Sequence, residues 1–156
     1  MNEKTFIQTK RLEIKLMTAE DVRKLLDETT EKELIKAYSE MLAGAVNDAA
    51  NAVWYLPWAM NLAADKTYIG NIGFHGPAVK KTVEIGYGVE PEFEGRGYTT
   101  EAAEAMVNWA FEQEGIEFVE AEAEESNAAS LRIIEKLGFQ RCGMGEEGPR
   151  FVKKKP

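Results

Sequence analysis

The middle of the chain carries three short segments rich in branched and aromatic residues, and their spacing limits the folds that it can adopt. They read AVWYLPWAMNL (52–62), TYIGNIGFHG (67–76) and TVEIGYGVE (82–90), and turn-like linkers, AADK and PAVKK, separate them. Such runs predict strands, and the short linkers predict an antiparallel meander. Pro57 inside the first segment indicates an edge strand or a bulge at that point.

Other patterns flank this meander on both sides. Before it, we expect a strand from Thr5 to Met17, a helix with a capping box at Thr18 and Asp21, and a second helix from Thr30. After it come a long helix ended by Gly115, a strand IEFVEAEAE (116–124), a helix over 127–137 and two last strands, FQRCGM and PRFVKKK. The sequence therefore predicts one α/β domain over residues 1–156, with a mixed, mostly antiparallel sheet of six to seven strands.

Composition excludes several classes of function. The net charge of −8 argues against a nucleic-acid binder. It fits cationic small molecules or basic peptides, although solubility alone is the simpler explanation. Cys142 and His75 are the only cysteine and the only histidine, so no internal disulfide and no thiolate-based zinc cluster is expected. Neither a signal peptide nor a membrane span is recognisable, and we therefore expect a cytoplasmic protein without membrane contact.

The stretch FEGRGYTTE (93–101) lies between the last strand of the meander and the long helix. A glycine-flanked loop at a helix start leaves backbone N–H groups unpaired, and these attract an anion. Gly95 and Gly97 let the backbone approach closely, Arg96 adds a cation, and Thr99 and Thr100 supply hydroxyl groups. This combination suits a pyrophosphate, although glycine before a helix is common in loops that bind nothing. The chain lacks both the P-loop string and the third glycine of a dinucleotide fingerprint.

A second motif, NAASLRIIEKLGF (127–139), follows one strand after the first. In this order and spacing the two motifs resemble the GNAT acetyltransferase superfamily, and within it the ribosomal-protein N-terminal (alanine) acetyltransferase branch. The resemblance covers most of the chain, including EIGYGVEPEFEGRGYTTEA. It implies a GNAT-like fold with helices on both sheet faces and a splayed cofactor cleft. It also implies acetyl-CoA as co-substrate and an amine acceptor, either a cationic small molecule or a protein N-terminus. No metal is expected, because a single histidine removes most metal sites, and monomer and homodimer both stay open.

The resemblance also implies which residues bind acetyl-CoA. The family's pyrophosphate pattern, Q/R-x-x-G-x-G/A, falls on residues 94–99, where Glu94 replaces Gln or Arg and Thr99 replaces the small last residue. Because a carboxylate repels a pyrophosphate, we expect Glu94 to point away and the loop amides to bind instead. The implied cofactor-binding residues are Tyr87, Gly88, Val89, Gly95, Arg96, Gly97, Tyr98, Thr99, Thr100, Asn127 and Ser130.

The strand TVEIGYGV resembles the family's splayed strand, whose backbone pairs with the pantetheine arm. We expect it to diverge from the strand in 116–124. Gly86 and Gly88 share one face of it with Glu84, and their small size leaves room either for a ligand or for a packed helix. Asn127 is expected to cap its helix, to contact the cofactor, or to do both.

Two residues are candidates for proton transfer. Ser130 matches the serine that protonates the departing thiolate in this branch, and Ile134 occupies the position of the superfamily's more common tyrosine donor. Glu84 is the favoured general base, because partial burial is expected to raise the pKa of a carboxyl group. His75 and a relaying water stay open as alternatives.

The remaining reactive and aromatic residues are interpreted as structural. Cys142 is expected to be a buried strand residue, and packing explains Trp54, Tyr55 and Trp58 better than an acceptor pocket does. The leading functional prediction is an acetyl-CoA-dependent N-acetyltransferase that works by direct transfer. The alternative is a non-catalytic CoA-binding or regulatory module of the same fold. A third hypothesis, an α/β domain without any ligand, requires the ordered pair of motifs to be coincidental.

Overall fold

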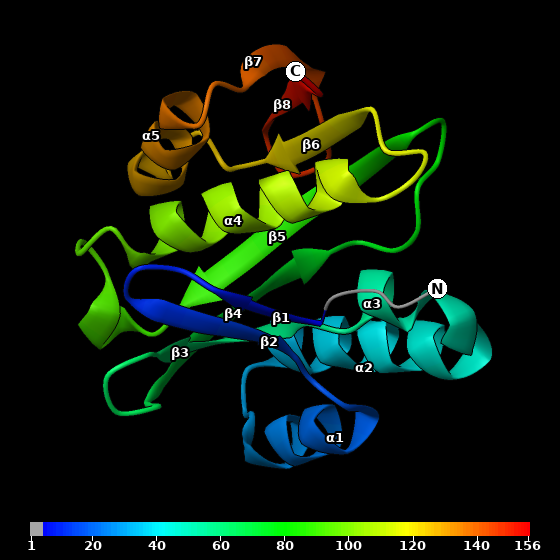
Figure 1. The fold of residues 1–156 in the computed structure, drawn as a ribbon, viewed down its shortest axis with the longest axis vertical. Coiled ribbons are helices and arrows are strands. Elements are labelled where there is room, and N and C mark those ends of the chain that lie inside the picture. The colour runs from blue at the N-terminus through cyan, green and yellow to red at the C-terminus, as the bar shows by residue number, and fades with distance from the viewer. Residues whose placement is uncertain (1–4) are drawn as a thin grey trace.

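A computed structural model describes residues 5–156. Groups of strands and groups of helices follow one another along the chain (Figure 1). The elements are β1 (Phe6–Gln8), β2 (Leu12–Leu16), α1 (Ala19–Glu28), α2 (Lys32–Asn47), η1 (Ala49–Asn51), α3 (Ala52–Tyr55), β3 (Trp58–Leu62), β4 (Tyr68–Phe74), β5 (Thr82–Val89), η2 (Pro91–Phe93), α4 (Tyr98–Glu112), β6 (Phe118–Glu122), α5 (Ala128–Lys136), β7 (Gln140–Met144) and β8 (Pro149–Lys154).

The strands form one sheet in the order β1-β2-β3-β4-β5-β6-β8-β7. Every neighbouring pair is antiparallel except β5 and β6, which are parallel. The sheet has eight strands rather than the expected six to seven, because residues 5–17 form a hairpin and not one strand. Its turn is closed by Thr9, whose amide donates to the Leu12 carbonyl and whose hydroxyl accepts from the Leu12 amide.

The segment 52–62 corrects another expectation. Residues 52–55 are helical, Pro57 precedes β3 rather than lying inside it, and β3 is an interior strand between β2 and β4. A register shift at Met60 and Asn61 does place a bulge in the pairing of β3 with β4. Proline is tolerated at position 57 because it precedes β3, so its missing N–H falls outside the hydrogen-bond ladder of the sheet. The antiparallel meander β3-β4-β5 itself is confirmed.

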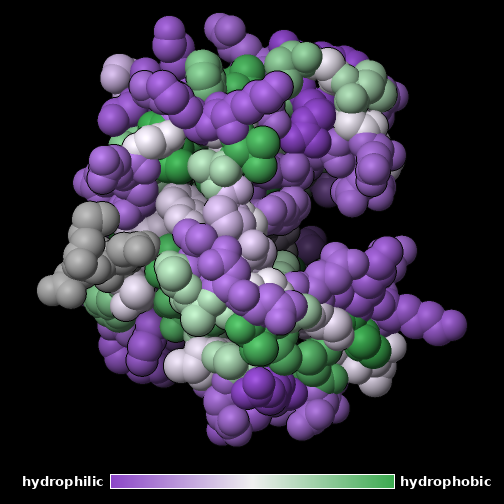
Figure 2. Space-filling model, turned by 90° about the vertical axis from the view of Figure 1, so that its right-hand side faces the viewer, coloured by the Kyte–Doolittle hydropathy of each residue, from purple (hydrophilic) through white to green (hydrophobic). Residues whose placement is uncertain are grey.

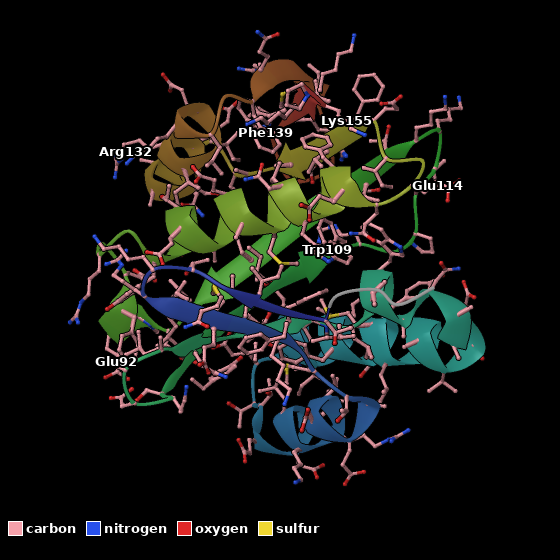
Figure 3. All side chains as sticks on the ribbon, viewed as in Figure 1. Glu92, Trp109, Glu114, Arg132, Phe139 and Lys155 are labelled. Atoms are coloured by element: carbon pink, nitrogen blue, oxygen red, sulfur yellow. The ribbon has the colours of Figure 1, made fainter. Side chains whose placement is uncertain are left out.

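Helices cover both faces of the sheet (Figure 1). The main hydrophobic core lies between α4 and the sheet, where Trp109 contacts the rings of Trp54, Trp58 and Phe74 at centroid distances of 5.0, 5.0 and 5.9 Å. Figure 3 shows Trp109 between α4 and the strands. A second core of Met17, Val22, Tyr38, Ala45 and Leu56 lies under α1 and α2 on the other face. Within residues 5–156, none of the helices combines the length and apolar character needed to span a bilayer.

The sheet opens between β5 and β6. Their parallel pairing covers only Thr82, Val83 and Glu84 against Phe118, Val119 and Glu120. Beyond Glu84, β5 continues to pair with β4 as far as Val89, while β6 continues to pair with β8. The expected divergence of these two strands is therefore present, and it begins at Glu84.

Candidate functional site

A cavity of about 610 Å³ is bordered by the end of β5, the start of α4 and one side of α5. Ten of the eleven residues predicted to bind the cofactor line it. Only Arg96, which is exposed and lies 5.7 Å from the centroid of the Phe93 ring, is absent from the lining. The lining residues are Tyr87, Gly88, Val89, Phe93, Glu94, Gly95, Gly97, Tyr98, Thr99, Thr100, Asn127, Ala129, Ser130, Arg132, Ile133 and Lys136.

The N-terminus of α4 forms one wall of this cavity. Gly97 is the N-cap residue and has φ 81°, and Gly95 has φ 74°, so both occupy the left-handed region that favours glycine. The first helical hydrogen bond runs from the Glu101 amide to the Gly97 carbonyl. The amides of Tyr98, Thr99 and Thr100 therefore have no acceptor within the helix, and they give this wall a partial positive charge.

A brace from the β1–β2 turn holds this loop in place. The Arg11 amide and the Arg11 Nε donate to the Glu101 carboxylate at 2.8 and 2.7 Å, and Arg11 Nη1 donates to the Arg96 carbonyl at 3.0 Å. The Thr9 hydroxyl also donates to Glu101. The Arg11 guanidinium lies 4.3 Å from the centroid of the Tyr98 ring, a cation–π distance. The sequence analysis missed this brace because the residues that form it are about 90 positions apart.

The opposite wall of the cavity belongs to α5. Asn127 Oδ1 accepts from the Ser130 amide at 3.1 Å, which confirms the predicted N-cap. Ser130 Oγ lies 2.9 Å from Tyr87 Oη, a hydrogen bond that either hydroxyl can donate. Burial raises the pKa of Tyr87, and its bond with Ser130 opposes that rise only in part. Two predicted residues from β5 and α5 are thus joined across the opening of the sheet.

Two cations in the lining escaped the sequence analysis. Arg132 and Lys136 lie on the cavity side of α5 together with Ala129 and Ile133. This spacing of three, four and seven residues marks one helix face and is the signal that could have found them. Arg132 extends from α5 at the same edge of the molecule as Glu92 of the β5–α4 connection (Figure 3). Glu94 also borders the cavity, although we expected it to turn away.

A second constellation surrounds Glu84 of β5, and its residues are not among those that line the cavity. His75 Nδ1 lies 3.0 Å from Glu84 Oε2, and Arg150 Nη2 donates to Glu84 and Glu120 at 2.9 and 2.7 Å. Arg150 Nη1 donates to Glu122 at 3.2 Å. Between the half that contains β6, β7 and β8 and the half that contains α1 and α2, the surface is hollowed and hydrophilic (Figure 2).

The charges in this constellation contradict one expectation. The hydrogen bond from His75 is the main cause that lowers the pKa of Glu84, and Arg150 adds to it, so the predicted rise by burial is wrong. The same contact with Glu84 raises the pKa of His75. Glu84 therefore stays ionised at neutral pH, and His75 is the stronger base of the two.

The glycines of β5 serve different purposes. A Cβ atom on Gly86 would lie 2.6 Å from His75 Nε2, so this glycine accommodates the His75 ring rather than a ligand or a helix. A Cβ atom on Gly88 would have no neighbour within 4 Å, and Gly88 opens onto the cavity.

The residues interpreted as structural have mixed outcomes. Cys142 is exposed on β7 and not buried as expected. Trp54 and Trp58 belong to the core, in agreement with their interpretation as packing residues.

Comparison with known proteins agrees with the resemblance found in the sequence. Residues 10–140 match the family model described as acetyltransferase (GNAT) domain. The uncharacterized N-acetyltransferase YoaA of Bacillus subtilis (strain 168) is 35% identical over 88 residues, 56% of this chain and 50% of YoaA, so the match spans about half the length of that relative. The uncharacterized N-acetyltransferase YnaD of the same strain is 28% identical over 145 residues, covering 88% of this chain and 84% of YnaD.

Solved structures share the fold over nearly the whole chain. RimL, a ribosomal L7/L12 alpha-N-protein acetyltransferase crystallised with coenzyme A, superposes with a TM-score of 0.74 and covers 96% of this chain and 97% of its own. The two sequences are only 14% identical, so this likeness concerns the fold.

Proposed function

Because this chain belongs to the acetyltransferase (GNAT) domain family, we propose that it is an acetyl-CoA-dependent N-acetyltransferase that transfers the acetyl group directly to a primary amine. The predicted family and the predicted α/β fold class are thereby confirmed. The observation that supports the activity best is the cavity at the N-terminus of α4, because it joins an anion-binding helix start to the opening between β5 and β6. We propose that residues 1–156 form one acetyl-CoA-binding domain that acts in the cytoplasm.

The residues present fit the parts of acetyl-CoA. The amides of residues 95–100 would receive the pyrophosphate, and Arg132 and Lys136 add positive charge on the facing wall. From Tyr87 to Val89, the edge of β5 that faces away from β4 lies along the opening, and it would pair with the amides of the pantetheine arm. Asn127 and Ser130 lie at the side of the cavity that faces this strand. The opening beyond Glu84 would then receive the thioester.

Proton transfer completes the proposed reaction. The amine must be neutral to attack, and ammonium groups have ordinary pKa values of about 8 for an α-amino group and about 10.4 for lysine. Glu84, ionised and held by His75 and Arg150, keeps the His75 ring oriented and stabilises its protonated form. The neutral form of His75 would then accept the proton of the amine, directly or through water. When the C–S bond breaks, Ser130 would protonate the thiolate.

The acceptor belongs to the same proposal. RimL is named for acting on the N-terminus of L7/L12, and the hydrophilic hollow between the two halves of the molecule suits a flexible peptide end or a small amine (Figure 2). We therefore propose a peptide α-amino group as the first acceptor to test and small cationic amines as the second. The negative net charge of −8 favours both, because both carry positive charge in solution.

One assay separates this proposal from a non-catalytic CoA-binding module. Acetyl-CoA is incubated with a peptide that has a free N-terminus, with the same peptide blocked at its N-terminus but carrying lysine, with a polyamine and with a free amino acid. Chromatography measures CoA and acetylated amine, which should form in equal amounts. Binding of CoA without turnover on any acceptor would favour the module. Absence of thermal stabilisation by CoA would contradict both functions.

A further inference from the structure

We infer that Tyr87 is the proton source behind Ser130: its phenol passes a proton through the serine hydroxyl to the departing CoA thiolate. The inference rests on the proposed acetyl transfer and adds a residue to it. It is carried by the 2.9 Å contact between Tyr87 Oη and Ser130 Oγ and by the position of both residues in the cavity lining.

The two hydroxyl groups are held from opposite sides. Tyr87 lies in β5, where it is in register with Ile72 of β4. Ser130 lies in the first turn of α5, and its amide is fixed by the Asn127 side chain. Each hydroxyl is therefore positioned by a separate element, and the contact bridges the opening of the sheet at the end nearest the cavity. A bond placed this way survives only if both elements keep their positions.

Acidity explains why the serine needs a partner. The leaving thiolate resembles a cysteine side chain, with an ordinary pKa of about 8.5, and a phenol has an ordinary pKa of about 10. An alkyl hydroxyl is a far weaker acid than either, so a serine acting alone would be left as an unfavourable alkoxide. With Tyr87 behind it, Ser130 gives one proton to sulfur and takes one from the phenol in the same step. The phenolate then regains a proton from water in the cavity.

Two other positions could supply a tyrosine donor, and neither is suited to this role. Ile134, at the position where the resemblance expects a tyrosine on the helix, is 2% exposed and belongs to the hydrophobic core. Tyr98 also lines the cavity, but its ring faces the Arg11 guanidinium and the Phe93 ring. With an ordinary pKa of about 10, the Tyr87 phenol carries its proton at neutral pH, and burial raises that pKa further. The phenol comes from the strand rather than from the helix.

The test compares Tyr87→Phe, Ser130→Ala and the double variant, each of which keeps most of the side-chain volume. Tyr38→Phe is the matched control, because it removes a hydroxyl that bonds Asn71 on the other face of the sheet. For a relay we expect each single variant to lose about 100-fold in kcat. The KM for acetyl-CoA and the Kd for CoA should stay within about twofold, and the double variant should be no slower than the worse single variant.

Three outcomes would overturn the inference. A Tyr87→Phe enzyme with kcat within about twofold of the parent removes the relay and leaves the proposed function intact. Multiplicative losses in the double variant show that the two hydroxyl groups act independently. A parent protein that binds CoA but acetylates no amine removes the proposed function, and the relay with it.

Discussion

Gly97 is the residue on which the anion-binding loop depends most directly. Its φ of 81° lies where a side chain costs about 1–2 kcal/mol, and a Cβ atom there would lie 3.4 Å from Arg11 Nη2. We expect Gly97→Val to weaken CoA binding at least about tenfold, because the loop amides must turn to relieve the strain. Isothermal titration with CoA measures this loss.

Gly115 offers a matched control for that variant. It has φ 84° at the other end of α4, and a Cβ atom there would have no neighbour within 4 Å. Gly115→Val should therefore lower stability through the same backbone strain while the Kd for CoA stays unchanged. Equal losses of CoA affinity in the two variants would show that Gly97 acts only through general stability.

The His75–Glu84 pair makes stability depend on pH in a definite direction. The pKa of His75 is raised from 6.5, so its contribution is complete below that value and is lost as the pH rises through the folded-state pKa. The pKa of Glu84 is lowered from 4.5, so its contribution holds above that value and is lost as the pH falls. Glu147 and Arg150 also act on His75, in opposite directions. The pair therefore stabilises the fold most between about pH 4.5 and 6.5.

We accordingly expect His75→Gln to lower the free energy of unfolding more at pH 5.5 than at pH 9. Urea unfolding of the parent and the variant at both values gives the comparison, and the slope with urea should not change. His75 is half-exposed, so solvent limits the size of the effect. The same loss of stability at both pH values would contradict a charged pair.

Among the elements, the short β1–β2 turn holds the loop that precedes α4. Arg11 is bound to Glu101 and to the Arg96 carbonyl, and it covers the Tyr98 ring. We expect Arg11→Ala to weaken CoA binding about three- to tenfold, since the loop loses its brace without losing any group that lines the cavity. The neighbouring Lys10→Ala, also an exposed cation, is the control. Unchanged CoA affinity in Arg11→Ala would limit the brace to a role in folding.

Elements with local signals were the predictable ones. Asn127 and Gly138 mark the ends of α5, and Thr18 with Asp21 marks the start of α1, as the structure confirms. The errors come from segments whose state depends on distant partners. Residues 52–55 have strand-like composition, but they form a short helix whose Trp54 packs against Phe74 and Trp109. Tertiary packing overrides local propensity at such positions.

In the site, too, residues within short motifs were predictable, whereas residues with distant partners were not. The glycine loop and the Asn–Ser spacing fall within short motifs, and the structure brings them together around one cavity. The partners of Glu84 come from β8 and from the residue after β4, and no local pattern pairs Arg150 with a residue 66 positions away. Its lowered pKa could not be predicted without those partners.

For the molecule as a whole, the opening between β5 and β6 predicts a pattern of hydrogen exchange. The Glu84 carbonyl accepts from His75 and the Glu90 amide donates to Ile69, so even-numbered residues of β5 direct their backbone groups toward β4. The odd-numbered residues Tyr87 and Val89 then direct theirs into the opening. CoA should slow exchange at those two amides and leave Gly86 and Gly88 unchanged, as residue-resolved NMR exchange can show. No slowing at Tyr87 and Val89 would place the pantetheine arm elsewhere.

The exposure of Cys142 has a practical consequence for spectroscopy. It is the only cysteine of the chain and lies on β7, the edge strand of the half that β6 joins to β5. A maleimide dye or nitroxide therefore attaches at one site of the natural sequence, without removal of other thiols. Desolvation, with Glu120 nearby, raises the pKa of this thiol, so labelling proceeds best in mildly alkaline buffer. The label then reports on the β6–β8 half while tryptophan fluorescence reports on the core beside α4.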